Sequence, residues 1–467
     1  MNQPHSTSLQ IAATVQQGQK SALEVAQAAL SRAESLQDRY RSFITLTPDL
    51  ALRQATDVQT RLKAGEKLPL AGVPFAVKDL MHVAGYPTTC GSKVLRDNKS
   101  TSDANVVRRL VKAGAVLIGK LNMFEFAFGF TGENQHYGDC KNPWDVTRIP
   151  GGSSSGSGVA VATGICPLTL GSDTGGSIRM PSALCNVVGL KPTYGRVTRA
   201  GVLPLSWSMD HVGPMARTVE EVALALHIMA GTDPDDDSTS EKPVPDYATD
   251  LQGRLKGLKI GVQHAWFGES LEPTVAEAFA KALDKLKTLG AQIVEVNLPY
   301  LSEVVGAHRA IIFSEASSYH RPLLEKQSAD YPDSIRPLLQ TGLFLTAVEY
   351  LHAQRVRRLV RAAWKPIFDQ IDALATPTLP MLAPKCGQQV ANLPGGEKPL
   401  VQAVLNFTLP FNLSGHPAVS IPCGFADGQP IGLQLVGKPF GEATILRIGH
   451  QYQLDTTWHQ QVAPVMV

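Results

Sequence analysis

Hydrophobic positions recur with helical spacing through the first part of the chain. Ser21-Ala-Leu-Glu24 has the form of a capping box, in which two side chains three residues apart satisfy free backbone amides, and it predicts a helix to about Leu36. A second helix is predicted from Pro48 to Lys63, closed by Gly65. We expect residues 1–65 to form a helical appendage that packs on the main body.

A strand–helix–strand rhythm follows. The apolar run Gly72–Lys78 predicts a buried strand that ends in a lysine, and a helix to Ala113 is expected to begin at Asp103 as its N-cap. The next apolar run, Ala115–Gly119, predicts a second strand. Because strands joined through a helix pair in parallel, the pattern indicates an α/β core.

The same rhythm continues towards the C-terminus. Thr218-x-x-Glu221 is a second capping box and predicts a helix to Ala230, whereas 232–250 is acidic, aperiodic and predicts a surface loop. Further strands are predicted at Val187–Leu190, Lys259–Val262, Ile293–Val296, Ile371–Ala375, Ala418–Ile421 and Ile431–Val436, and further helices at Pro273–Leu289, Glu442–Gln453 and over most of 302–370. We expect one domain over 1–467, with a helical insert at about 300–370.

The composition fits a globular chain and argues against several functions. Hydrophobic residues make up 43% of the 467 residues, and 43 basic against 41 acidic side chains give a net charge of +2. So small a charge gives no basis for nucleic acid or an anionic membrane as a partner. The six cysteines include no Cys-x-x-Cys pair, and no apolar run has the length of a membrane span. We expect no metal, no cofactor and no membrane. The first ten residues lack the features of a signal peptide, which predicts a cytoplasmic protein.

Two segments rich in glycine and serine carry the candidate chemistry. The first is Pro-Gly-Gly-Ser-Ser-Ser-Gly-Ser-Gly at 150–158, and the second is Leu-Gly-Ser-Asp-Thr-Gly-Gly-Ser-Ile-Arg-Met at 170–180. Apolar flanks argue against a flexible linker, and the missing Lys-Ser/Thr pair argues against a phosphate-binding loop. Gly152–Gly156 matches the Gly-x-Ser-x-Gly nucleophile elbow, but a proline-bounded loop precedes it where such an elbow needs a strand.

An amide hydrolase that uses no histidine is the interpretation left. None of the twelve histidines lies in a context that singles it out as a base. A lysine can activate a serine when burial or positive neighbours lower its pKa enough to leave the amine neutral. Lys78 ends an apolar strand and is placed for this role, although a lysine at the end of a strand is more often solvated.

Several ordered motifs resemble the amidase signature family. They are Val73–Asp79, Pro150–Gly158, Gly171–Arg179, Gly189–Thr193, Pro417–Pro422 and Pro430–Leu435. The resemblance implies an amidase-signature α/β fold, with a mixed, mostly parallel central sheet covered by helices on both faces. It also implies a Ser–cis-Ser–Lys triad, in which Ser177 matches the nucleophile, Ser153 the bridging serine on a cis peptide bond, and Lys78 the base. The backbone amides of the oxyanion hole match those of Thr174, Gly175, Gly176 and Ser177.

The resemblance also implies a mechanism. Neutral Lys78 takes the proton of Ser177 through the Ser153 hydroxyl, Ser177 attacks the amide carbon, and water then hydrolyses the acyl-enzyme. Three neighbouring residues are expected to hold the two catalytic loops in place: Ser154, Asp173 and Arg179. The alternative is that they make ordinary loop hydrogen bonds with no effect on catalysis.

The substrate is less well defined, because the family contains stand-alone amidases, biuret- and carboxybiuret-type hydrolases and the glutaminase subunit of the tRNA-dependent amidotransferase. Arg357 resembles the arginine that grips the substrate carboxylate in that subunit, but the acid that holds the glutamine amine is missing from 405–415. Residues 124–130 and 132–138 resemble the other two groups more closely. We therefore consider four candidate substrate-binding residues, with core packing as an equal alternative for the phenylalanines: Phe128, His136, Tyr137 and Arg357.

We predict a linear-amide hydrolase that acts on a small carboxamide or ureido substrate and releases ammonia or an amine. The alternatives are the glutaminase subunit and a biuret- or carboxybiuret-type hydrolase. A binding protein on this scaffold is disfavoured because Lys78, Ser153 and Ser177 are all present. The resemblance further implies a homodimer, with the helices before residue 65 at its interface.

Overall fold

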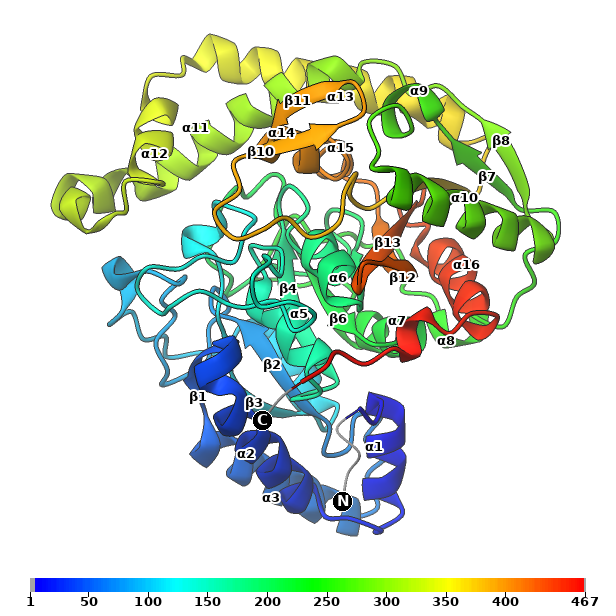
Figure 1. The fold of residues 1–467 in the computed structure, drawn as a ribbon. Coiled ribbons are helices and arrows are strands. Elements are labelled where there is room, and N and C mark those ends of the chain that lie inside the picture. Colours follow the sequence, from blue (N-terminus) through cyan, green and yellow to red (C-terminus); the bar gives the residue numbers. More distant parts are fainter. Residues whose placement is uncertain (1–4, 466–467) are drawn as a thin grey trace.

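The structure is a computed structural model and describes residues 5–465 (Figure 1). Its strands are β1 (Phe43–Leu46), β2 (Pro74–Lys78), β3 (Val116–Leu121), β4 (Leu168–Asp173), β5 (Val188–Lys191), β6 (His211–Ala216), β7 (Lys259–Val262), β8 (Gln292–Glu295), β9 (Ala373–Pro377), β10 (Val390–Leu393), β11 (Gly396–Pro399), β12 (Ala418–Ala426) and β13 (Gln429–Val436). An 11-stranded sheet has the order β1-β3-β2-β4-β6-β5-β12-β13-β9-β7-β8, and β10 and β11 form a separate pair.

Helices separate most of these strands along the chain. They are α1 (Ser8–Gln16), α2 (Ala22–Tyr40), α3 (Pro48–Lys63), α4 (Asn105–Lys112), α5 (Ser155–Ala162), α6 (Arg179–Cys185), α7 (Val219–Met229), α8 (Tyr247–Asp250), α9 (His264–Phe267), α10 (Pro273–Thr288), α11 (Leu301–Gln327), α12 (Arg336–Leu343), α13 (Ala347–Phe368), α14 (Leu400–Leu405), α15 (Pro410–Ser414) and α16 (Glu442–Leu454). Short 3₁₀ turns lie at Lys93–Leu95, Glu125–Ala127, Ser328–Asp330 and Trp458–Gln460.

The α/β class and the mixed central sheet are confirmed, but the expectation of a mostly parallel sheet needs correction. Parallel pairing is confined to the flanks: β2 with β3 and β4 on one side, and β7 with β8 and β9 on the other. Every pair from β4 to β9 is antiparallel, as is β1 with β3. The turn Asp427-Gly428 between β12 and β13 shows why, because two residues cannot make the crossover that parallel strands require.

Two of the predicted helix starts are confirmed and a third is wrong. Both capping boxes are present, at the starts of α2 and α7. Asp103 is not the N-cap of α4, because Ala104 takes that position. The Asp103 carboxylate instead accepts a hydrogen bond from the Ala84 amide at 2.7 Å and so fixes a loop.

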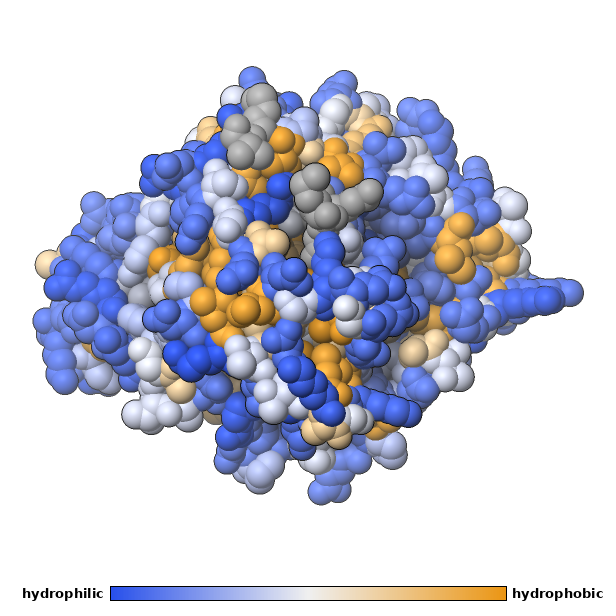
Figure 2. Space-filling view, turned by 90° about the horizontal axis from the view of Figure 1, so that it is seen from below, coloured by the Kyte–Doolittle hydropathy of each residue, from blue (hydrophilic) through white to orange (hydrophobic). Residues whose placement is uncertain are grey.

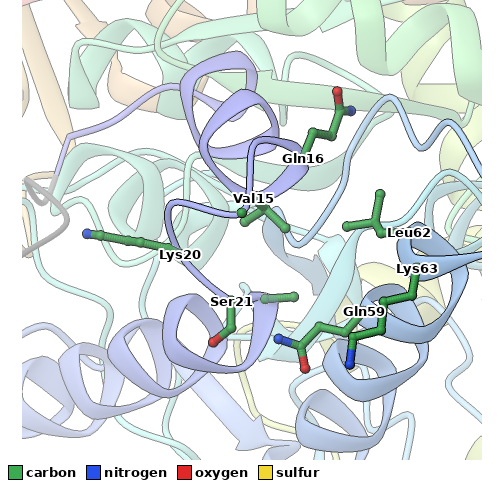
Figure 3. A pocket seen from close by; sticks show the side chains of 9 residues that line it. Val15, Gln16, Lys20, Ser21, Gln59, Leu62 and Lys63 are labelled. Atoms are coloured by element: carbon green, nitrogen blue, oxygen red, sulfur yellow. The ribbon is translucent and has the colours of Figure 1, made fainter. Parts of the chain in front are cut away.

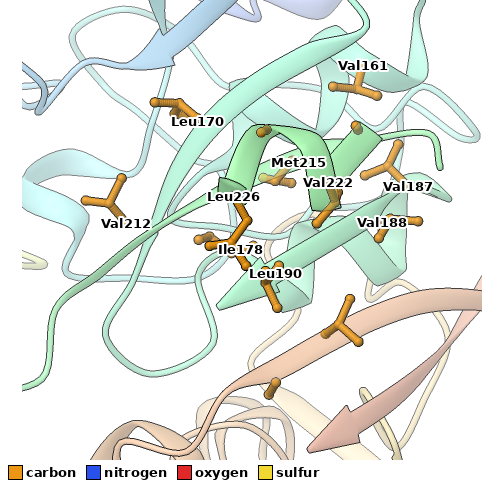
Figure 4. Packing of buried hydrophobic residues seen from close by; sticks show 14 of the residues in the cluster. Val161, Leu170, Ile178, Val187, Val188, Leu190, Val212, Met215, Val222 and Leu226 are labelled. Carbon is orange, nitrogen blue, oxygen red and sulfur yellow. The ribbon is translucent and has the colours of Figure 1, made fainter. Parts of the chain in front are cut away.

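Helices cover both faces of the sheet and bury its middle (Figure 1). α5 and α6 pack against each other and against β4 and β5, whereas α7 packs against β6, α4 and α16. Figure 4 shows the resulting core, in which Leu170 and Leu190 of the sheet lie near Leu226 of α7, and all three are fully buried. This packing fixes the strand ends from which the site residues project.

The first three helices and the helical insert lie on opposite sides of the sheet (Figure 1). Below the sheet, α1, α2 and α3 enclose a surface hollow of about 320 Å³ (Figure 3). The face seen from below is largely hydrophilic, with hydrophobic residues in separate patches (Figure 2). The predicted insert spans α11, α12 and α13, and α11 packs against both of the others. Over the described residues, no helix is both long and apolar enough to cross a bilayer.

Candidate active site

Lys78 is the last residue of β2 and is fully buried. Its neighbour β4 runs parallel to β2, so the carboxyl ends of both strands meet at one edge of the sheet. The Lys78 Nζ donates to the Ser153 Oγ at 2.7 Å and to the Ser172 Oγ of β4 at 2.8 Å. The structure therefore brings together two of the predicted triad residues and adds Ser172, which the sequence analysis missed.

Burial also changes the acidity of this amine. Removal from water lowers the pKa of Lys78 from 10.5 to about 7, although the nearby Asp173 and Asp210 carboxylates act in the opposite direction. A group with this pKa is half neutral at physiological pH. The lysine is therefore able to accept a proton there, as a general base must.

The peptide bond between Gly152 and Ser153 is cis, as the resemblance implied. Ser154 then links the two glycine- and serine-rich segments. Its amide donates to the Ser177 carbonyl at 3.3 Å, and its hydroxyl donates to the Ser172 carbonyl at 3.1 Å. These contacts hold Ser177 and Ser153 on adjacent loops.

The carboxylate of Asp173 organises the loop that carries Ser177. It accepts hydrogen bonds from the Gly176 and Ile178 amides at 2.8 and 3.1 Å. The Arg179 guanidinium contacts the same carboxylate at 2.9 and 3.0 Å, and all of these groups are buried. Burial alone would raise the pKa of the Asp173 carboxyl, but Arg179 and the hydrogen bonds hold that pKa well below its ordinary value.

The four amides proposed for the oxyanion hole are not equivalent. The Gly176 amide is already used by Asp173, whereas Thr174, Gly175 and Ser177 line a cavity. Gly176 has a φ of +135°, and a Cβ there would collide with Thr408. At Gly175 a Cβ would have 3.6 Å to its nearest neighbours. Backbone conformation and crowding therefore require a glycine at position 176. At position 175 the neighbouring atoms leave room for a Cβ.

Two buried residues that the sequence analysis missed fix Thr174. The His308 Nε2 of α11 lies 2.9 Å from the Thr174 carbonyl, and burial lowers the pKa of this histidine to about 4. The Thr174 hydroxyl donates to the Asp210 carboxylate at 2.5 Å, and burial raises the pKa of Asp210 to about 6. No local pattern marks His308, because it lies on an amphipathic helix far along the chain from the serine motifs.

A cavity of about 360 Å³ opens over Ser177. Its walls are mostly apolar and include Phe128, Phe130, Ile312 and Leu405. The Phe128 ring packs against Phe313 of α11 with 5.6 Å between the ring centroids. Phe128 thus lies where the sequence analysis placed a candidate substrate contact.

The other candidate substrate contacts lie away from this cavity. The Arg357 guanidinium is buried and donates to the Leu413 carbonyl at 2.7 Å and to the Ser208 carbonyl at 2.6 Å, so it fastens α13 to α15 and to the loop that carries Ser208. The His136 ring lies 3.2 Å from the Glu125 carboxylate. In the described part of the chain, Arg357, His136 and Tyr137 do not line the cavity over Ser177. Within residues 5–465, no group of three or more His, Cys, Asp or Glu side chains is placed to hold a metal ion.

The chain is similar to known proteins over most of its length. A family model described as Amidase matches residues 24–446. The chain is 41% identical over 482 aligned residues to a subunit of the glutamyl-tRNA(Gln) amidotransferase of Chloroflexus aurantiacus, with 98% of each chain covered. A solved structure from work on a vestigial protein complex and the origins of an s-triazine catabolic enzyme is 37% identical, with a TM-score of 0.92 over 99% of this chain and 100% of that one. A crystal structure of an amidase is 35% identical, with a TM-score of 0.88 over 96% and 100%.

The fold, the buried lysine and these similarities define a hydrolase that acts on C–N bonds. The match covers most of the chain in both the sequence and the structural comparisons. The chain therefore belongs to the amidase signature family.

Proposed function

We propose that the chain hydrolyses the C–N bond of a small linear carboxamide or ureido substrate through a Ser177 acyl-enzyme. The observation that carries the proposal is the 2.7 Å contact between the Lys78 Nζ and the Ser153 Oγ, at a fully buried lysine whose pKa is lowered to about 7. Such a lysine supplies a base at neutral pH without a histidine.

The first half of the reaction forms the acyl-enzyme. The neutral Lys78 amine accepts the Ser153 hydroxyl proton while Ser153 accepts the proton of Ser177. The Ser177 Oγ forms a bond to the substrate carbonyl carbon, and the negative charge moves to the carbonyl oxygen. The amides of Thr174, Gly175 and Ser177 supply donors for this oxyanion. The C–N bond then breaks, and the proton returns from Lys78 through Ser153 to the leaving nitrogen.

The second half releases the acyl group. A water molecule takes the place of the leaving amine and gives its proton through Ser153 to Lys78. Its oxygen bonds to the acyl carbon, and the bond to the Ser177 Oγ breaks. The proton returns to Ser177, so the products are a carboxylic acid and ammonia or an amine.

The test is ammonia or amine release from a panel of amides by the wild type and by Lys78→Ala, Ser153→Ala and Ser177→Ala. We expect each replacement to lower kcat/KM by at least 10³-fold, because removing the base or nucleophile removes covalent catalysis. Lys67→Ala is a matched control, because Lys67 is exposed, and it should keep full activity. Near-full amidase activity in Lys78→Ala or Ser177→Ala would contradict the proposal.

The glutaminase subunit of an amidotransferase is a second candidate, favoured by the 41% identity to a relative that is an amidotransferase subunit. Two features speak against it. Residues 400–415 contain no acidic side chain to hold the amine of glutamine, and Arg357 is occupied by backbone carbonyls. Glutamine hydrolysis that appears only with an added partner subunit would favour the second candidate.

Biuret, carboxybiuret and ureido acids belong in the same substrate panel, since a similar structure comes from work on an s-triazine catabolic enzyme. We also propose a homodimer through α1, α2 and α3, with the hollow between these helices at the contact face. Light scattering after size-exclusion chromatography tests it, and a monomeric mass at micromolar concentration would refute it.

A further inference from the structure

Arg309 differs in character from the residues around it. It lies on α11 and lines the cavity over Ser177, whose walls are otherwise mostly apolar or aromatic. Among the lining residues, Arg309 is the one whose side chain is always charged, and none of them is Asp or Glu. An isolated cation on an apolar wall is a binding group for an anion.

The helix explains how this residue reaches the cavity. His308 and Ile312 form one i, i+4 pair on α11, and Arg309 and Phe313 form the next, so one helix face presents all four to the cavity. His308 also contacts the Thr174 carbonyl, which places this face beside the predicted oxyanion hole. Arg309 is solvent-exposed while the other members of the face are at least partly buried, so Arg309 marks the mouth of the cavity.

The guanidinium is available for a ligand. Across residues 5–465, Arg309 has neither an ion-pair nor a hydrogen-bond partner. Arg357 shows the opposite case, because three of its contacts go to Ser208 and Leu413 inside the protein. The carboxylate-binding role considered for Arg357 from sequence is therefore better filled by Arg309.

We propose that Arg309 binds a carboxylate at the end of the substrate's acyl group that is remote from the scissile amide. This inference rests on the proposed function and narrows its substrate class to monoamides of dicarboxylic acids and ureido acids. The absence of an acidic lining residue adds a second expectation. A substrate that also carries an ammonium group, such as glutamine, has no partner for that charge and binds less well.

The test compares glutaramate with pentanamide, which lacks the carboxylate, and with glutamine, which adds an ammonium group. Succinamate and adipamate cover other distances between amide and carboxylate. We expect wild-type kcat/KM to favour the best monoamide over its neutral counterpart by about tenfold or more, as one charge-assisted contact provides. Raised ionic strength should reduce this ratio.

Three variants assign the preference to the side chain. Arg309→Met should bring the ratio of kcat/KM for the anionic amide to kcat/KM for pentanamide close to one, chiefly by raising KM for the anionic amides. Arg309→Lys should keep part of the preference, since it keeps the charge but loses the planar fork. Arg355→Met is the matched control, because Arg355 is an exposed helical arginine outside the cavity, and its ratio should equal that of the wild type.

Calorimetric binding of the same amides to Ser177→Ala separates this inference from the proposed function. Binding of a monoamide that is lost in Ser177→Ala/Arg309→Met supports the anion site, even if the wild type hydrolyses no amide and the proposed function fails. Equal hydrolysis of charged and neutral amides by the wild type, or an unchanged ratio in Arg309→Met, overturns the anion site and leaves the amidase in place. Failure of every monoamide to bind Ser177→Ala overturns it as well.

Discussion

The pH dependence of catalysis tests the role of Lys78 most directly. If its neutral amine is the base, kcat/KM must follow the fraction of Lys78 that is deprotonated. Burial lowers the pKa of this lysine from 10.5 to about 7. We therefore expect kcat/KM to rise about tenfold per pH unit below pH 7 and to level off above it.

The structure sets the size of the effect. A solvated lysine is neutral in roughly one molecule in 3,000 at pH 7, whereas the buried Lys78 is neutral in about half. The difference corresponds to roughly 5 kcal/mol of destabilisation of the charged form. The same shift means that the unfolded chain binds more protons than the folded chain between pH 7 and 10.5. The contribution of Lys78 to the free energy of unfolding therefore rises with pH between pH 7 and 10.5.

Ammonia release from a neutral amide, measured from pH 5 to 10, gives the profile, and a neutral substrate avoids any titration of the substrate itself. Asp210 needs a control, because burial raises the pKa of its carboxyl to about 6 and it contacts Thr174. In Asp210→Asn the midpoint should stay near 7 and move slightly downward, since the Asp210 carboxylate raises the pKa of Lys78. The pH profile of the residual hydrolysis by Lys78→Ala should show no midpoint near pH 7.

Two results would refute this reasoning. One is a midpoint above pH 9, which would mean that Lys78 keeps an ordinary pKa and that burial does not neutralise it. The other is an unchanged midpoint in Lys78→Ala, which would assign the titration to another group. Circular dichroism of each variant at the pH extremes excludes unfolding as the cause of lost activity.

The remaining predictions concern the loops and their supports. Gly176→Ala should abolish activity, because its positive φ and the Thr408 contact leave no room for a Cβ, whereas Gly175→Ala should fold normally; equal thermal stability of the two variants would count against this. Arg357→Met should lower the free energy of unfolding by about 2–3 kcal/mol through its lost hydrogen bonds without a selective rise in KM for charged amides, as urea titration and kinetics will show. Asp173→Asn removes the carboxylate counter-ion of the buried Arg179 guanidinium and should cost about 3–5 kcal/mol at pH 7. The Asp173→Asn loss should shrink below pH 4, because the depressed pKa of Asp173 stabilises the fold only where the unfolded carboxyl is ionised.

Local sequence patterns predicted the parts of the fold that have local causes. Capping boxes mark α2 and α7 because the two side chains and the amides they bind lie within four residues. Strand β1 was missed because four residues between two helices carry no alternation, and its pairing with β3 depends on distant contacts. Strand β6 was missed because His211–Ala216 contains a Gly-Pro pair that ordinarily argues against a strand interior.

The residues of the candidate site also fall into two groups, those that a local motif marks and those that depend on distant contacts. The positions of Lys78 and Ser153 follow from ordered motifs, and the structure places them in contact. Ser172 lies inside the motif Gly171–Arg179 and belongs to β4, which pairs with β2. Its proximity to Lys78 could therefore have been predicted from the sequence. Arg309 and His308 had no such signal, because nothing in a helical pattern says which face will meet a cavity. That information exists only after the insert has packed over the loops.

The network around Arg179 has a consequence for how the protein is made. Arg179 donates to the Thr408 carbonyl at 2.9 Å, to Asn412 at 2.6 Å and to Gln434 at 2.7 Å. The loop that carries Ser177 is thus fastened by residues more than two hundred positions later in the chain. During synthesis the motifs emerge from the ribosome long before these partners do. A nascent or truncated chain that ends before these residues therefore carries the serines and the lysine without the contacts that fasten the Ser177 loop.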